Sequence, residues 1–230
     1  MATNDNYEFV KKEITSTQDK CCLVLVLDVS GSMAGTPINE LNDYVKVLFE
    51  DIKEDNVASQ RLEIGIVTFD STVNLVRKPE NVWNNTIIPH LTLGGLNTSM
   101  VDGIREAIML VNATKDYYKS TNQGYYKPLI ILVSNNFYSS VHDINIITQE
   151  IKAGVNSQKY LFYLIAVEGS NMNKIQQVSS NISYAIKLQD IRRLQDFIYS
   201  SDRSYIEKST KDAKIIFYNG MDSWKDFMVD

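Results

Sequence analysis

An acid and two hydroxyls follow the first apolar run of the sequence with a spacing of two residues. Asp28, Ser30 and Ser32 come directly after the run "LVLVL" at residues 23–27. Carboxylate and hydroxyl oxygens are hard ligands, which suit Mg²⁺ or Mn²⁺ better than zinc or copper. The same residues also fit a turn that caps the next helix, or a loop that carries a serine nucleophile. Their types and spacing alone leave all three interpretations open.

The nucleophile interpretation lacks the residues that it needs. A nucleophile elbow has glycine two residues before and two residues after its serine, but Ser30 has Asp28 and Ser32 at these positions. The only histidines, His90 and His142, are expected in a loop and at a helix start, where they would be ordinary surface residues rather than bases. A Walker loop and a G-x-G-x-x-G motif are both missing from the sequence, so nucleotide binding has no motif behind it.

The composition predicts one α/β domain with a tail. The 230 residues are 44% hydrophobic, and a net charge of -5 argues against a nucleic-acid surface, which needs clustered Lys and Arg. The only cysteines, Cys21 and Cys22, are neighbours and make neither a disulfide framework nor a zinc site. The N-terminus does not resemble a signal peptide, and every apolar run is far shorter than the roughly 20 residues that cross a bilayer. We therefore expect a soluble, cytoplasmic protein.

Apolar runs alternate with helical patterns along the chain. Buried strands are predicted at Leu23–Leu27, Leu62–Phe69, Leu129–Val133 and Leu161–Val167, and an antiparallel edge strand at Thr72–Val76. Helices are predicted from stripes over Ile38–Ile52, Ile104–Val111, Asp143–Ala153, Met172–Val178 and Asp190–Tyr205. The pattern predicts a doubly wound, Rossmann-like α/β fold, in which a mostly parallel sheet with one antiparallel edge strand has helices on both faces.

The starts of the first two helices carry recognisable signals. Pro37 is expected at the first helical position, with Thr36 as the N-cap. Ser99, with Asp102 three residues later, resembles a capping box at the start of the second helix.

In open parallel sheets ligands bind beyond the carboxyl ends of the strands, which is where Asp28 and the two serines are expected.

A series of segments extends the first motif into a family resemblance. Asp28-Val29-Ser30-Gly31-Ser32 matches the D-x-S-x-S signature of von Willebrand factor A domains. The segments "LVLDVSGSMAGTPINELNDYVKVLFEDI", "IGIVTFDS", "NTSMVDGIREAI", "YYKPLIILVSN", "LIAVEGSNMNKIQQVSS" and "IKLQDIRRLQDFI" then follow in order. This order resembles the bacterial TerY-like A domains, which are named for tellurite resistance. The resemblance divides the chain into an N-terminal segment (1–18), an A domain (19–205) and a C-terminal extension (206–230).

The resemblance implies a metal-ion-dependent adhesion site. Ser30 and Ser32 would be direct ligands of Mg²⁺ or Mn²⁺, Asp28 would hold the ion directly or through water, and Thr98 would be a state-dependent ligand. An Asp or Glu of a partner protein would complete the shell. Such domains bind proteins and generally catalyse nothing. TerY-like members resemble stress-response components encoded beside kinase and phosphatase partners, in tellurite-resistance or phage-defence gene groups.

Two loops depart from the family pattern. Ser134-Asn135-Asn136 stands where the family usually has Thr-Asp-Gly, and Leu96-Asn97 stands before Thr98 where glycines are usual, although Gly94 and Gly95 lie just ahead. Asn135 removes one negative charge, and two unit charges about 4 Å apart interact by roughly 4 kcal/mol at an effective dielectric of about 20. Asn135 still offers a carbonyl oxygen, so we expect weakened metal binding rather than none.

Other outcomes remain open from the sequence. One is a metal-free site in which Asp28, Ser30, Ser32, Thr98 and Asn135 form a hydrogen-bond network that preserves a binding face. Another is a metal-dependent hydrolase or phosphotransfer enzyme that uses Asp28, although such enzymes usually gather several carboxylates around the ion. A third is a purely structural subunit. We expect the loops around Ser30, Thr98 and Asn135 to contact the partner.

Overall fold

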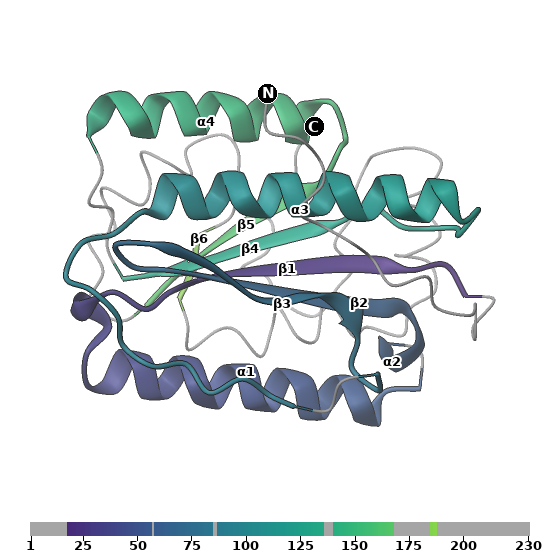
Figure 1. Cartoon of the computed structure of the whole chain (residues 1–230), viewed down its shortest axis with the longest axis horizontal. Helices are drawn as coiled ribbons and strands as arrows, with labels where there is room; N and C mark the ends of the chain where they lie inside the picture. The colour runs from purple at the N-terminus through teal and green to yellow at the C-terminus, as the bar shows by residue number, and fades with distance from the viewer. Residues whose placement is uncertain (1–17, 57, 85–86, 136–139, 168–184, 188–230) are drawn as a thin grey trace, which may run out of the picture.

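The chain folds around one central sheet. The computed structural model describes residues 18–56, 58–84, 87–135, 140–167 and 185–187. Its six strands lie in the order β3-β2-β1-β4-β5-β6. Their bounds are β1 Cys21–Asp28, β2 Leu62–Phe69, β3 Val73–Asn81, β4 Leu129–Ser134, β5 Leu161–Ala166 and β6 Ala185–Lys187. Only the pair of β2 and β3 is antiparallel among the described strands, which confirms the predicted architecture (Figure 1).

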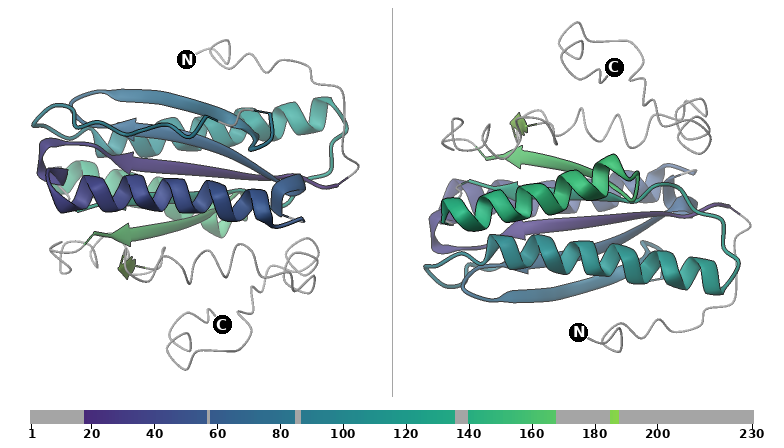
Figure 2. Two further views of the ribbon diagram at one scale, coloured as in Figure 1. Left: turned by 90° about the horizontal axis from the view of Figure 1, so that it is seen from below. Right: turned by 90° about the horizontal axis from the view of Figure 1, so that it is seen from above.

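Helices cover both faces of this sheet. On one side lie α1 (Thr36–Glu54), the short α2 (Ala58–Arg61) and a 3-10 turn, Gly31–Met33. On the other side lie α3 (Met100–Ser120) and α4 (Val141–Asn156). The views from below and above show α1 against one face and the pair α3 and α4 against the other (Figure 2). None of the helices in the described parts of the chain is both long and apolar enough to cross a membrane.

The central strand β1 has no exposed apolar face. Leu23, Leu25 and Leu27 belong to the core on the α1 side, whereas Val24 and Val26 belong to the core on the α3 and α4 side. All five side chains have 0% exposure. Side chains of a strand alternate between the two faces, so a strand that is covered on both faces must be apolar throughout. This requirement explains the continuous apolar run.

Two helix starts differ in detail from the sequence prediction. Helix α1 begins at Thr36 itself, and its N-cap is Gly35, whose φ of 85° is accessible to glycine without strain. Helix α3 begins after Ser99 as expected, but the Ser99 hydroxyl donates to the carbonyl of Ser71 (3.1 Å) instead of capping the helix. The predicted capping box is therefore wrong, because the Ser99 side chain is turned toward Ser71 and accepts no N–H of the first turn. Asp102 instead forms an ion pair with Arg105, in which Oδ1 lies 3.8 Å from Nη1.

Several predicted elements lie outside the described residues. These are the N-terminal segment 1–18 except for residue 18, the helices over 172–178 and 190–205, and the C-terminal extension 206–230. The edge strand β3 confirms the predicted antiparallel partner of β2 and is longer than expected.

Candidate functional site

The candidate site lies beyond the carboxyl ends of β1 and β4. The parallel register pairs Leu27 with Val133, so the next residues, Asp28 and Ser134, come side by side. The connection from β3 to α3 reaches the same edge: Gly94 N–H donates to the Val29 carbonyl (2.8 Å) and Gly31 N–H donates to the Gly95 carbonyl (2.9 Å). Three segments that are far apart in the sequence therefore meet at one end of the sheet, at the left of Figure 1.

Asp28 is a buried carboxyl group with donors on both oxygens. Its exposed fraction is 1%. The N–H of Ser30 donates to Oδ1 (2.9 Å), and the Ser134 hydroxyl donates to Oδ2 (2.6 Å). Burial raises the pKa of Asp28, and the negative charge of Asp70 adds to this, while the hydrogen bonds from Ser134 and Ser30 oppose it. No Lys or Arg of the described residues is ion-paired with Asp28, so a bound cation would relieve the cost of burying its charge.

Ser30, Ser32 and Asn135 present a row of oxygens next to this carboxyl group. The hydroxyls of Ser30 and Ser32 are 3.0 Å apart, and the Ser32 hydroxyl donates to Oδ1 of Asn135 (2.9 Å). Neighbouring ligands of an octahedral Mg²⁺ lie about 2.9 Å apart, given metal–oxygen distances of 2.0–2.1 Å. Hydroxyl and amide oxygens of this spacing, next to the carboxyl group of Asp28, fit Mg²⁺ or Mn²⁺. Ser32 is exposed, whereas Ser30 is buried, so the row is open to a partner at its Ser32 end.

Asn135 makes a second contact that an aspartate would lack. Its Nδ2 donates to the backbone carbonyl of Ser32 (2.5 Å), while its Oδ1 accepts from the hydroxyl of the same residue. The amide thus binds Ser32 through both of its polar atoms and ties the loop after β4 to the loop after β1. A carboxylate here would place a negative oxygen against the Ser32 carbonyl. The loops are therefore held together without an ion.

Thr98 is the one predicted ligand that no hydrogen bond joins to the other four. Its Oγ1 is buried and has no partner among the described residues. A buried hydroxyl without a partner is costly, and a metal ion or water would relieve it. The next residue is held in place, because Ser99 N–H donates to the Asp70 carbonyl (2.5 Å).

Two contributors were missed by the sequence analysis. Ser134, with 0% exposure, is a direct hydrogen-bond partner of Asp28 and was noted only as part of a family departure. Asp70, which directly follows β2, forms a turn through the bond from Thr72 N–H to its Oδ1 (2.7 Å). Its Oδ2 also accepts from Gly95 N–H (2.7 Å), so Asp70 positions the connection that carries Thr98. The pair Gly94-Gly95 was the available signal, since a side chain at Gly94 would collide with the Asp70 carboxylate.

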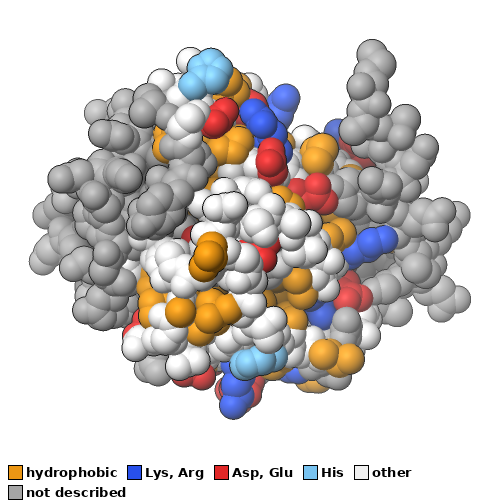
Figure 3. Space-filling model, turned by 60° about the vertical axis from the view of Figure 1, so that its left-hand side comes forward, with side chains coloured by type: hydrophobic (Ala, Val, Ile, Leu, Met, Phe, Trp, Pro, Cys, Tyr) orange, Lys and Arg blue, Asp and Glu red, His pale blue; other side chains and the backbone are white. Residues whose placement is uncertain are grey.

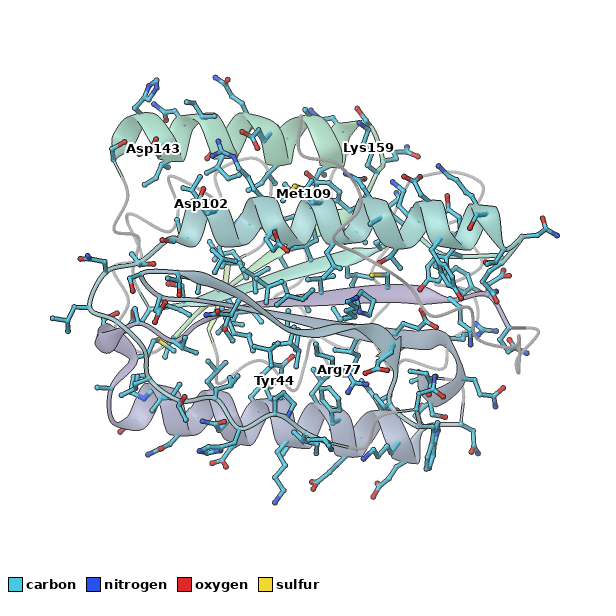
Figure 4. The ribbon with its side chains drawn as sticks, in the orientation of Figure 1. Tyr44, Arg77, Asp102, Met109, Asp143 and Lys159 are labelled. Carbon is cyan, nitrogen blue, oxygen red and sulfur yellow. The ribbon has the colours of Figure 1, made fainter. Side chains whose placement is uncertain are left out.

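Other acids at this end of the sheet take no part in the cluster. Asp102 and Asp143 lie in the first turns of α3 and α4 and are exposed (Figure 4). The described part of the chain contains no group of three or more His, Cys, Asp and Glu side chains arranged for a metal. The candidate site therefore combines one carboxyl group, Asp28, with neutral oxygen donors.

The fold agrees with the family comparison. The family model for the von Willebrand factor type A domain matches residues 23–200. The chain belongs to this family, whose members mediate protein–protein interactions and commonly bind a divalent metal. Among curated proteins, no sequence matches the chain.

Solved structures share the fold at low sequence identity. A von Willebrand domain of a type V pilus tip protein from Porphyromonas gingivalis has 11% identity and a TM-score of 0.52, with 82% of this chain and 96% of that chain covered. The manganese-loaded TRAP protein of Plasmodium vivax has 13% identity and a TM-score of 0.51, with 79% and 74% covered. A matrix protein of the mussel byssus has 14% identity and a TM-score of 0.51, but the match spans 80% of this chain and only 46% of that protein.

Proposed function

We propose that the chain is a non-catalytic protein-interaction module that binds an acidic side chain of a partner through a weakly held Mg²⁺ or Mn²⁺. The observation that carries this proposal is the joining of Asp28, Ser30, Ser32 and Asn135 in one hydrogen-bonded cluster at an open edge of the sheet. Ser30, Ser32, Thr98 and Asn135 would supply neutral oxygens to the ion, and Asp28 would supply the negative charge. The ion would draw a partner's carboxylate to the remaining position.

The weak affinity follows from the charges of the donor set. Asp28 supplies a single negative charge, so a divalent cation keeps a net positive charge that a partner's acid neutralises. The hydrogen bonds of Asn135 also hold the loops together without metal, so the ion is not needed to shape the binding face. The TRAP structure was solved with manganese, which supports a divalent ion on this fold.

The cellular role in this proposal is that of a cytoplasmic component of a bacterial stress response. The ordered TerY-like segments support it, and they favour a tellurite-resistance or phage-defence type system with kinase or phosphatase partners. The domain would then act as an adaptor, because the cluster around Asp28 supplies a docking point rather than a nucleophile with its base.

Titration calorimetry with MgCl₂ and MnCl₂ tests the metal. We expect weak binding to the native protein, with a dissociation constant of about 1 mM, which corresponds to about 4 kcal/mol of binding free energy. Asp28→Asn should abolish the signal, since the buried charge is lost while the shape is kept. Asp102→Asn is the matched control, because it removes an exposed acid at the same end of the sheet. Equal heats for the native protein and Asp28→Asn would remove the metal from the proposal.

A phosphatase assay distinguishes the module from the enzyme alternative. We expect no turnover of para-nitrophenyl phosphate with Mg²⁺ or Mn²⁺ present, because metal-dependent hydrolases rely on several carboxylates around the ion. Turnover that disappears in Asp28→Asn and persists in Asp102→Asn would contradict the non-catalytic assignment.

A further inference from the structure

Exposed apolar side chains are concentrated in the connection that carries Thr98. The large apolar side chains with high exposure among the described residues are Val76, Trp83, Ile87, Leu93, Leu96 and Met109. Four of the six lie between β3 and α3. Leu96 is the most exposed, at 93%. Leu93 and Leu96 flank the pair Gly94-Gly95, which is hydrogen-bonded to the loop after β1. Trp83 lies instead beyond the far end of β3, where Asn81 pairs with Glu63 at the start of β2. Exposed apolar side chains next to a polar site mark an interaction surface.

Leu96 borders the row of oxygens. Gly31 stands between Ser30 and Ser32, and a β-carbon on Gly31 would lie 2.9 Å from Cδ2 of Leu96. The leucine side chain therefore lies against the loop that carries both hydroxyls, and the rest of its surface faces solvent. Apolar side chains gather on this face of the molecule (Figure 3).

The backbone on the N-terminal side of Leu96 is fixed at several points. Gly95 N–H donates to the Asp70 carboxylate, and its carbonyl accepts from Gly31 N–H. Further back, the side chain of Asn42 on α1 accepts from Leu91 N–H (2.7 Å) and donates to its carbonyl (3.0 Å). The connection thus runs along α1 to the edge of the sheet (Figure 1). A leucine held out by a fixed backbone binds with little loss of chain entropy.

We propose that Leu96 is a specificity-determining contact, which selects a partner segment whose acidic residue has an aliphatic or aromatic side chain close by. The inference rests on the proposed function, since the acid is held by the ion. Leu96 lies against the loop that carries Ser30 and Ser32, so an apolar side chain next to the partner's acid can cover it. Covering a leucine side chain strengthens binding by about tenfold or more.

A phage-displayed library of random peptides, selected on the native protein in MgCl₂, tests the inference. We expect enrichment of an acid with Leu, Ile, Met or Phe within about three residues, which is the reach of an extended chain from the ion to Leu96. Leu96→Gln should keep the acid and lose the apolar preference. Met109→Gln, an equal change at an exposed position on α3, should keep both.

Synthetic peptides from that selection give the measured effect. Affinity should fall about tenfold when Leu96 becomes Gln, and also when the apolar residue of the peptide becomes Ala, with no further loss when both are changed. Acid enrichment without an apolar neighbour would overturn the role of Leu96 and leave the proposed function standing. Selection without an acid would overturn both. Self-association in sedimentation that is abolished by Leu96→Gln, with no peptide preference, would also overturn the inference.

Discussion

Asp28 and Asp70 end or follow neighbouring parallel strands, yet their surroundings shift their acidity in opposite directions. Both side chains are buried, with exposed fractions of 1% and 9%. Asp70 accepts hydrogen bonds from the N–H and hydroxyl of Thr72 and from the N–H of Gly95. The bond from Thr72 N–H leads the effects that lower its pKa, whereas burial dominates at Asp28 and raises its pKa.

The contrast separates a structural acid from a binding acid. The hydrogen bonds that Asp70 accepts stabilise its charge, and they hold the β3–α3 connection in place. Asp28 has a carboxyl group whose charge remains costly after its bonds to Ser30 and Ser134 are counted. A cation would therefore stabilise the charge of Asp28, at the end of β1, more than that of Asp70. Asp70 instead holds the neighbouring loop in place.

The largest expected effect is on stability when Asp70 is removed. Asp70→Ala leaves the N–H groups of Thr72 and Gly95 without their acceptor, so the free energy of unfolding should fall by about 3 kcal/mol. Urea denaturation measures the change. Asp102→Ala, at an exposed position, is the control and should stay within about 0.5 kcal/mol of the native protein. A loss below about 1 kcal/mol for Asp70→Ala would contradict its structural role.

The next effect concerns metal affinity and the charge at residue 135. Asn135→Asp adds a second negative charge beside Asp28, so Mg²⁺ affinity should rise by about tenfold or more in calorimetry. Without metal the same variant should be less stable by about 1 kcal/mol, because the bond to the Ser32 carbonyl is lost. Asn112→Asp, on the exposed side of α3, is the matched control for charge. Unchanged affinity would place Asn135 outside the ion site.

A smaller effect is expected from the hydroxyl that supports Asp28. Ser134→Ala removes the hydrogen bond to Oδ2 and should lower the free energy of unfolding by about 1 kcal/mol. The pKa of Asp28 should rise further, because this bond stabilises the charged form. Urea denaturation measures the free energy of unfolding, and its pH dependence follows the pKa of Asp28. Calorimetry with MgCl₂ measures metal binding in parallel. An equally stable variant with unaltered metal binding would show that Ser134 contributes nothing to the site.

The smallest effect is a pH dependence of opposite sign for the two acids. A lowered pKa contributes stability above the ordinary carboxyl range, and this contribution is lost as the pH falls through the folded-state value, so the advantage of native protein over Asp70→Asn should shrink on acidification. A raised pKa acts the other way, so the stability of the native protein relative to Asp28→Asn should increase on acidification. Urea denaturation in EDTA between about pH 7 and about pH 2 measures both differences, because the contribution of Asp70 is lost below the ordinary carboxyl pKa. Parallel slopes would end the distinction between the acids.

Much of the fold was predictable because burial dictates the sequence of its strands. The predicted runs at residues 23–27, 62–69, 129–133 and 161–167 agree with β1, β2, β4 and β5 to within two residues. Helix caps were less predictable. Ser99 stands at the expected position, but its hydroxyl is turned toward the Ser71 carbonyl and accepts no N–H of the first turn.

The candidate site was predictable in its residue types and less so in its contacts. Asp28, Ser30, Ser32 and Asn135 do come together, while Thr98 lies in the same region without a bond to them. The double contact of Asn135 with Ser32 was not visible from the sequence, because it depends on the relative placement of two loops 103 residues apart. The partnership of Ser134 with Asp28 likewise follows from strand register rather than from a motif.

The sequence by itself determined the alternation of strands and helices, the family, and the set of oxygen-bearing residues, since periodicity and motif spacing are local properties of the chain. Only the tertiary structure decided which carboxyl group has a buried charge that its hydrogen bonds do not fully stabilise. Asp28 and Asp70 are the same residue type at the same edge of the sheet. Their pKa values shift in opposite directions because burial and hydrogen-bond donors are supplied by residues that folding brings near.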